Sequence, residues 1–476
     1  MTIQVARQEL DSLTEFQKGI HVTNNVSEEL ISTFYKAFIK STWHSCLPMK
    51  LKCTSDGEET VYSVNTSFHY LCESYLKFNL PAIRVKPEYK GRVRICWPHN
   101  IGTNITLQAS FKEDDDVYQT WDNVWADYYF QYYQASGAGK REAHNVGMGN
   151  VKCLEDWSEY LPAYSINADQ PWFYSFGGDP AFSFPIYAKG SETRAEHRYT
   201  FRRKVTDLLR VQILDKNLKW KDISRTKGVS KYLENHPAMI KTPELWGRFV
   251  YNSDQELKFY KCQGERSIYI RDVEVCDSPN PTKYKSISEI DLHSTNPCLA
   301  IFWAAENRDA VLNHNFSNYT TDTNDIYSGW DPIKTTTLKY GTVKRLDEMT
   351  SDHFNITEAR RHFPSAPSER GYQAYSFAWE STNFHGDVGI VFDGLNAKLQ
   401  CRIDNNNIFA DNHQEEEEKE ETDDGDDDIS VSTVEGIAPV EEEPSPDFVT
   451  RVRLLVVRKF TISHNEDEDK YSFKIQ

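Results

Sequence analysis

Short segments rich in β-branched and aromatic residues follow one another through most of the chain, and turn residues separate most of them. Such segments predict strands, and turn clusters such as Ser55 to Gly57 and Asp277 to Pro281 mark the connections. Because few helical patterns lie between the strands, antiparallel sandwiches are favoured over a parallel α/β sheet. The predicted strands are 59–64, 91–97, 104–111, 198–204, 245–251, 266–275, 335–342, 373–379, 394–403 and 451–462.

The length and an internal similarity indicate two domains. A chain of 476 residues exceeds the roughly 250–300 residues at which a single core stops growing. Each half begins with paired strands, contains an inserted helix and closes on a strand rich in basic and apolar residues, at 198–210 and at 451–460. We therefore expect two similar sandwiches in tandem.

Three segments have helical patterns. Residues 253–262 begin with Ser253 and Glu256 in the spacing of a capping box, and 29–39 is a further short candidate. In 117–133 the apolar residues recur every three or four positions, which predicts an amphipathic helix between strands. These apolar residues are Val117, Trp121, Val124, Tyr128 and Tyr132.

The net charge of −18 belongs mainly to one segment. Residues 411–447 contain 17 acidic residues and one basic residue, Lys419, which leaves 55 acidic and 53 basic residues elsewhere. The segment falls between the late predicted strands 394–403 and 451–462, so we expect a disordered acidic insertion in a nearly neutral body. Without clustered Lys and Arg, direct nucleic-acid binding is disfavoured.

The chain lacks the patterns of membrane and secreted proteins. Its longest apolar runs, such as 298–305 and 454–457, are far shorter than the roughly 20 residues that span a bilayer. The N-terminus has no basic region followed by an apolar one, as a signal peptide has. We therefore expect synthesis and assembly in a cytosol.

Catalytic, cofactor and metal motifs are absent from the sequence. Ser136 to Lys140 (SGAGK) resembles a phosphate loop, but Gln134 and Arg141 replace the Gly and the Ser or Thr that a P-loop requires, so a mobile loop is favoured. Neither a zinc motif nor a GxSxG elbow occurs, and the nine cysteines are scattered without close pairs. We expect no catalytic residue, cofactor or metal, although paired carboxylates of a glycosidase would escape a sequence search.

Six Asn-x-Ser/Thr sites are candidate glycosylation positions. Glycosylation requires a compartment that the missing signal peptide argues against, so chance occurrence is favoured. The six asparagines are Asn25, Asn65, Asn104, Asn315, Asn318 and Asn355.

Several segments resemble, in their order along the chain, the double jelly-roll major capsid proteins of large eukaryotic DNA viruses, the group of iridoviruses, phycodnaviruses and asfarvirus-like viruses. In the first half these are 97–102 (WPHNIG) with the strand and helix after it, 170–187 (QPWFYSFGGDPAFSFPIY) and 199–209. In the second half they are 245–260, 290–303, 330–340, 352–355 and 371–378 (GYQAYSFA), of which the last is the most specific. The resemblance covers about residues 45–476.

The resemblance implies an all-β fold of two tandem eight-stranded jelly rolls with a few short inserted helices. The expected organisation is an N-terminal arm at 1–40, a first jelly roll at 41–212, a linker at 213–243, and a second jelly roll at 244–476. The acidic insertion at 411–447 would then lie on the particle exterior or between capsomers.

The implied function is structural, with no enzymatic activity. Three copies would form a pseudo-hexagonal capsomer, and capsomers would tile an icosahedral virion shell assembled in the host cytoplasm. Other implied partners are neighbouring capsomers, minor capsid proteins and, through the N-terminal arm, an internal viral membrane. Two alternatives stay open: a jelly-roll carbohydrate-binding protein or glycosidase, and a minor or penton-type capsid paralogue.

Overall fold

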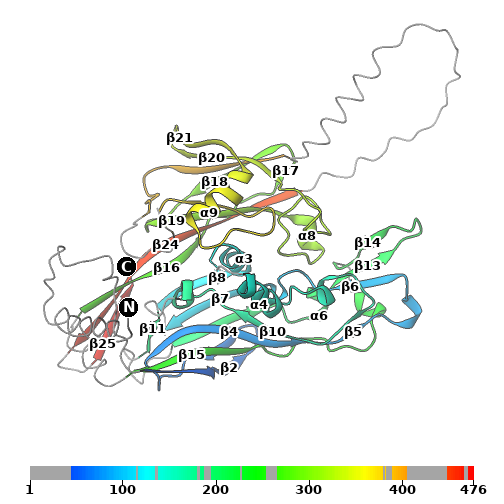
Figure 1. Ribbon diagram of the computed structural model, residues 1–476, viewed down its shortest axis with the longest axis horizontal. Coiled ribbons are helices and arrows are strands. Elements are labelled where there is room, and N and C mark those ends of the chain that lie inside the picture. The colour runs from blue at the N-terminus through cyan, green and yellow to red at the C-terminus, as the bar shows by residue number, and fades with distance from the viewer. Residues whose placement is uncertain are drawn as a thin grey trace, which may run out of the picture.

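The computed structural model describes residues 44–113, 116–133, 138–178, 183–186, 195–225, 228–252, 265–378, 381, 389–404, 447–465 and 470–475. Two β-sandwiches lie one above the other in the view of Figure 1, and short helices face the viewer. The all-β prediction is confirmed, because antiparallel strands make up all the sheets of the described residues.

The first sandwich, which we call the first roll, consists of two five-stranded sheets. One sheet has the order β1 (His44–Lys50), β15 (Glu244–Asn252), β4 (Tyr70–Leu80) and β10 (Tyr164–Asp169), with β11 (Phe184–Pro185) also on β4. The other has the order β2 (Lys52–Asp56), β3 (Thr60–Ser63), β12 (Ala195–Phe201), β7 (Thr106–Glu113) and β8 (Asp116–Asp122).

Two smaller sheets extend the first roll. One contains β14 (Trp220–Asp222), β13 (Arg210–Leu214) and β6 (Val93–Cys96), and the other pairs β5 (Ile83–Arg84) with β9 (Tyr160–Leu161). In Figure 1 these strands lie at the right-hand end of the molecule, opposite β25.

The second sandwich, the second roll, also has two sheets. One has the order β16 (Glu265–Val275), β24 (Asp447–Asn465), β19 (Cys298–Asn307) and β22 (Gln373–Ser376), with β17 (Thr282–Lys283) and β25 (Lys470–Ile475) also on β24. The other has the order β18 (Ser286–Leu292), β23 (Ala397–Ile403), β20 (Ile333–Tyr340) and β21 (Val343–Thr350).

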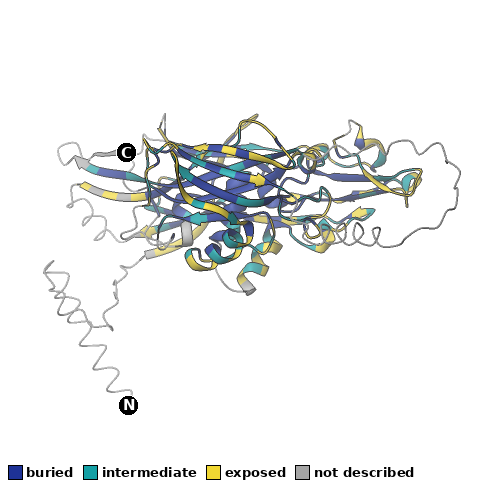
Figure 2. Cartoon of the chain, turned by 90° about the horizontal axis from the view of Figure 1, so that it is seen from above, coloured by how far each residue is buried: buried dark blue, intermediate teal, exposed yellow. Residues whose placement is uncertain are grey.

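The helices are short and lie mostly along one side of the two sandwiches (Figure 2). The α-helices are α2 (Ile101–Asn104), α3 (Asn123–Tyr132), α4 (Ala138–Met148), α5 (Lys152–Glu155), α6 (Val205–Leu208), α8 (Arg308–Leu312) and α9 (Ala359–His362). The other helical turns are η2 (Pro87–Tyr89), η3 (Phe173–Gly178), η6 (Val229–Tyr232) and the π-helical η7 (His353–Glu358). No helix in the described ranges is long and apolar enough to cross a membrane.

The structure corrects two secondary-structure predictions. Residues 117–122 belong to strand β8, and the helix begins only at Asn123, because the Asp122 side chain caps it by accepting a hydrogen bond from the Trp125 backbone N–H at 2.9 Å. Residues 138–140 of the predicted mobile loop Ser136 to Lys140 instead begin α4, which packs along β10.

A third finding concerns where the second roll begins. Strand β15, expected to open the second roll, instead pairs with β1 and β4 in a sheet of the first roll. Its buried residues Leu245 and Phe249 pack in the core of that roll. The candidate helices at 29–39 and 253–262, the N-terminal arm and residues 411–446 of the acidic insertion lie outside the described residues.

Candidate functional site

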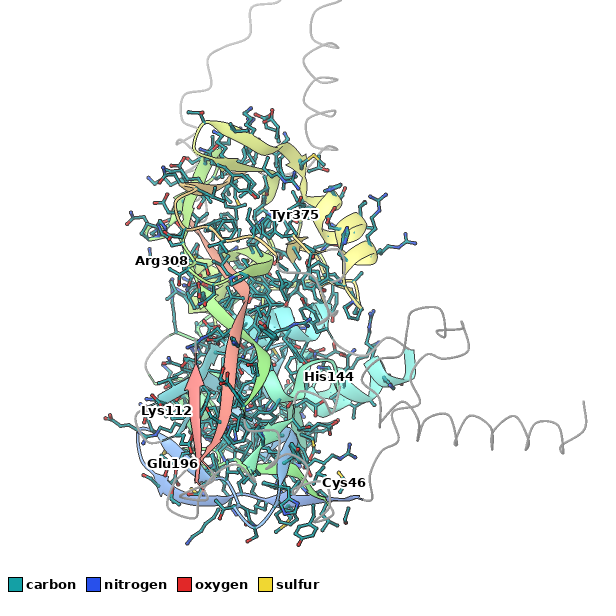
Figure 3. All side chains as sticks on the ribbon, turned by 90° about the vertical axis from the view of Figure 1, so that its left-hand side faces the viewer. Cys46, Lys112, His144, Glu196, Arg308 and Tyr375 are labelled. Atoms are coloured by element: carbon teal, nitrogen blue, oxygen red, sulfur yellow. The ribbon has the colours of Figure 1, made fainter. Side chains whose placement is uncertain are left out.

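The contact between the two rolls joins parts of the chain that lie far apart in sequence. We call the whole contact the seam; its centre is formed by α3 and β8 of the first roll against β16, β19 and β24 of the second, and the segment around α2 extends it. In the end-on view of Figure 3 the second roll, with Tyr375, lies above the first, with Lys112, Glu196 and Cys46, and side chains fill the space between. One hydrophobic cluster contains buried residues of both rolls, including Phe111 and Phe302.

Strand β19 is buried on both faces because it lies between two cores. All ten of its residues are buried. Ile301, Trp303 and Ala305 face the core of the second roll, while Ala300, Phe302 and Ala304 belong to the shared cluster. A strand covered on both sides needs apolar residues at consecutive positions, which explains the apolar run at 298–305.

Aromatic rings of α3 surround Phe302 across the seam. The ring centroids of Trp125, Tyr128 and Tyr132 lie 5.6, 6.1 and 5.2 Å from that of Phe302. Phe363 of the second roll completes the group at 5.4 Å from Phe302. Edge-to-face and offset contacts at these distances add stabilisation beyond the area buried, so α3 fixes the first roll against the second.

Arg453 of β24 forms an ion pair with each roll. Its side chain is 1% exposed, and its guanidinium donates to Asp122 of the first roll at 2.5 and 3.2 Å and to Asp277 of the second. Burial alone would lower the pKa of Arg453, but the charges of Asp122 and Asp277 outweigh burial and raise it. The cation therefore stays charged inside the seam and holds two carboxylates from different rolls.

Arg451, two residues earlier on β24, extends this network. It donates to Glu306 at 2.8 Å and to Asp277 at 3.0 Å. Its backbone carbonyl accepts a hydrogen bond from the Tyr128 hydroxyl of α3 at 3.0 Å. The two arginines and three acidic residues are thus paired with one another, as buried charges must be.

A second polar contact between the rolls is centred on His99, just before α2. Its Nδ1 lies 2.5 Å from a carboxylate oxygen of Glu155 in the first roll, and its Nε2 lies 3.0 Å from one of Glu369 in the second. Burial alone would lower the pKa of His99, but Glu369 and Glu155 raise it well above its ordinary value. The imidazole is therefore a cation between two carboxylates.

Asp127 of α3 is buried close to His99. Its carboxylate accepts hydrogen bonds from Asn100 at 3.3 Å and from the Tyr319 hydroxyl of the second roll at 3.1 Å. Burial raises the pKa of Asp127 to about 7. This side chain is a hydrogen-bonding group of the seam that gains its charge only near neutral pH.

The structure places the candidate glycosylation asparagines in different environments. Asn104 is fully buried and donates to Ser317 of the second roll at 2.6 Å, so this residue belongs to the seam. Asn315 and Asn318 are also buried, with amide groups bonded to backbone carbonyls. A buried, bonded amide has no room for a glycan in this fold.

The other three candidate asparagines are either half-buried or outside the described residues. Asn355 is half-buried and donates to the carbonyls of Glu369 and Tyr372, and Asn65 is half-buried beside β3. Asn25 lies outside the described residues. Only Asn25, Asn65 and Asn355 therefore stay candidate positions, with chance occurrence of the motifs still favoured.

The described residues contain no group of three or more His, Cys, Asp or Glu side chains that is placed to hold a metal ion. Sequence reasoning missed the seam residues Asp122, Arg453 and His99. The only sequence signal for Arg453 was its place in the predicted closing strand at 451–460, which is rich in basic and apolar residues. Together, the ion pairs, hydrogen bonds and aromatic contacts of the seam hold the two sandwiches together as one body.

Comparisons with known proteins agree with this architecture. The model of a family described as large eukaryotic DNA virus major capsid protein matches residues 260–431. The major capsid protein of Invertebrate iridescent virus 3 is 25% identical over 392 residues, which cover 78% of this chain and 81% of the relative. That of Lymphocystis disease virus 1 is 24% identical over 375 residues, or 74% of this chain and 78% of the relative.

Solved structures show the same fold. PBCV-1 VP54 superposes with a TM-score of 0.64 at 10% identity, over 93% of this chain and 99% of that one. The Faustovirus major capsid protein has a TM-score of 0.61 at 7% identity, over 91% and 92%. The predicted double jelly roll is thereby confirmed. Sequence and fold lead to one conclusion: the chain is similar in sequence to the major capsid proteins of large eukaryotic DNA viruses, and it has the double jelly-roll fold.

Proposed function

We propose that three copies of this chain form a pseudo-hexagonal capsomer and that such capsomers tile an icosahedral virion shell. The observation that carries the proposal is the seam, because a core continuous through both rolls makes each chain one rigid block. Three blocks of two similar sandwiches supply six similar units around an axis. Relatives named as major capsid proteins support a role in the virion capsid and favour a major over a minor component.

The structural role is favoured over the carbohydrate-binding and glycosidase alternatives. The curated relatives are capsid proteins and not enzymes. The buried acidic residues of the seam are paired with arginine, histidine or tyrosine and do not face one another across an open cleft. These carboxyl groups stabilise the contact between the rolls.

The purified chain is expected to have three times its monomer mass of 55.2 kDa, because permanent capsomer interfaces are large. Multi-angle light scattering over a range of concentrations measures this directly. A single monomeric species at every concentration, in the absence of other viral proteins, would rule the homotrimer out.

We propose further that residues 1–40 form an arm that contacts minor capsid proteins or an internal membrane. The amphipathic pattern at 29–39 supports this role. Deletion of 1–40 is expected to leave the trimer mass unchanged and to reduce particle yield in co-expression with the other capsid components, counted by electron microscopy. Normal particle yield from the deletion variant would contradict the arm's role.

A further inference from the structure

The hairpin of β13 and β14 projects from the end of the first roll. Its tip holds Leu218, which is 78% exposed and adopts a positive φ of 61°. Asp215 fixes the turn, since its carboxylate accepts the backbone N–H groups of Asn217 and Lys219, each at 2.8 Å. The hairpin tip therefore carries one apolar side chain that is held in a fixed turn and is open to contact.

The hairpin tip is basic as well as apolar. Lys216, Lys219 and Lys221 stand around Leu218 and Trp220, and both Lys219 and Lys221 are exposed. Trp220 is held in place by the Arg94 guanidinium, 4.2 Å above its ring. The tip therefore offers a fixed surface with an apolar centre and positive charges around it.

The acidic segment of the chain has the complementary order of residues. In sequence, 12 of the acidic residues lie in 411–428, an interval with Ile429, Val431, Val434 and Ile437 and a single acid, Glu435, follows, and Glu441 to Glu443 come next. Acidic residues thus stand on both sides of an apolar interval, as lysines stand on both sides of Leu218 and Trp220. Opposite charges around an apolar centre favour a specific contact.

The positions of the hairpin and of the C-terminal end of the acidic segment in the fold are compatible with a contact between the two. The acidic segment rejoins the fold at Asp447, which pairs with Lys283 of β17, and β17 lies in the same half of the long axis as the hairpin (Figure 1). A flexible chain of 42 residues, the number in 405–446, spans about 5–6 Å times the square root of that number, or tens of ångströms. The hairpin tip projects away from its own second roll.

We propose that the β13–β14 hairpin docks the acidic segment, residues 411–446, of a second copy of this chain. This inference rests on the proposed capsomer assembly and adds to it a contact between two neighbouring copies of the chain. The lysine side chains pair with the acidic runs, and Leu218 and Trp220 pack against the apolar interval.

Carbodiimide cross-linking of the assembled full-length chain tests the docking, because this reagent joins a lysine amine to a carboxylate in contact with it. Equal amounts of ¹⁵N-labelled and unlabelled chain are assembled together, so that mass spectrometry distinguishes links between copies from links within one. The expected result is mixed-label links from Lys216, Lys219 or Lys221 to acidic residues of 411–446. These links should decrease at high salt, which screens exposed charges.

Three variants make the test specific. Replacing the three hairpin lysines (K216Q, K219Q and K221Q) removes the link sites, so association of these copies is read from particle yield, which should fall. The matched control replaces Lys339, Lys344 and Arg345 of the β20–β21 hairpin with glutamine and should keep both the links and the yield. Leu218→Ser should reduce the mixed-label links while every lysine remains.

Links only within one copy, no links at all, or equal effects of the two lysine variants would overturn the docking. Light scattering of the same samples separates this from the proposed function. If trimers and particles form and the hairpin variants behave like wild type, only the docking fails. If the wild-type chain stays monomeric, the capsomer proposal itself fails.

Discussion

Replacing Arg453 with alanine is expected to lower the free energy of unfolding by about 3–5 kcal/mol, because removing one member of a buried ion pair leaves charges without a partner. Asp122 would then lose its cationic partner and Asp277 would keep only Arg451, and both side chains are largely buried, at 28% and 20% exposure. Asp122 would keep its role as the cap of α3, so the loss concerns the ion pairs of the seam.

The decrease can be measured by urea denaturation followed by circular dichroism and by tryptophan fluorescence. Arg198→Ala is the matched control, since Arg198 pairs with Glu59 and Glu196 at the surface, at 36% side-chain exposure. A surface pair contributes less than about 1 kcal/mol. A midpoint shift for Arg453→Ala no larger than that for Arg198→Ala would show that the seam does not depend on this cation.

The strands were largely predictable from sequence because burial on one face imposes a period of two. In β18, for example, Ile290 and Leu292 are buried while Glu289 and Asp291 are exposed. The same pattern cannot say which sheet a strand joins. Strand β15 alternates correctly for either roll, and only its pairing with β1 and β4 assigns it to the first.

The seam was not predictable because its contacts link residues far apart in sequence. Asp122 and Arg453 are separated by 331 positions, and His99 and Glu369 by 270. No local pattern marks such a pair. One sequence signal was available and missed: Asp122, a residue type favoured at helix N-caps, marks where β8 ends and α3 begins.

Stability is expected to decrease at alkaline pH through the loss of the His99 proton. The pKa of His99 is raised well above 6.5 in the folded chain, so its contribution is fully present below about pH 6.5 and is lost as pH rises through the folded value. Glu369 shows the opposite linkage. Burial alone would raise its pKa, but the charge of His99 lowers it, so its contribution is lost as pH falls through that lowered value.

Two other groups around His99, Asp127 and Tyr327, titrate in other pH ranges. Asp127 has a pKa raised to about 7, so it gains its charge in the unfolded chain near pH 4 and in the folded chain only near pH 7. Its stabilising contribution therefore falls between about pH 4 and pH 7 and is constant above. Tyr327, whose ring lies 6.5 Å from that of His99, has a pKa raised by burial to about 12 and stays neutral. Buried cysteines and tyrosines elsewhere in the chain also contribute between pH 7 and pH 11, so the effect of His99 is read from a comparison with a variant.

Comparison of wild type with His99→Gln isolates this effect. Glutamine keeps a hydrogen-bond donor but no charge, and it leaves Glu155 and Glu369 close together in the seam. At pH 6–7 the variant is expected to be less stable by about 3 kcal/mol, because it removes the cation from a buried cluster of charges. As pH rises, the wild type loses the same cation, so the two unfolding free energies converge. A difference that stays constant from pH 6 to pH 11 would mean that His99 is not the charged link between the rolls.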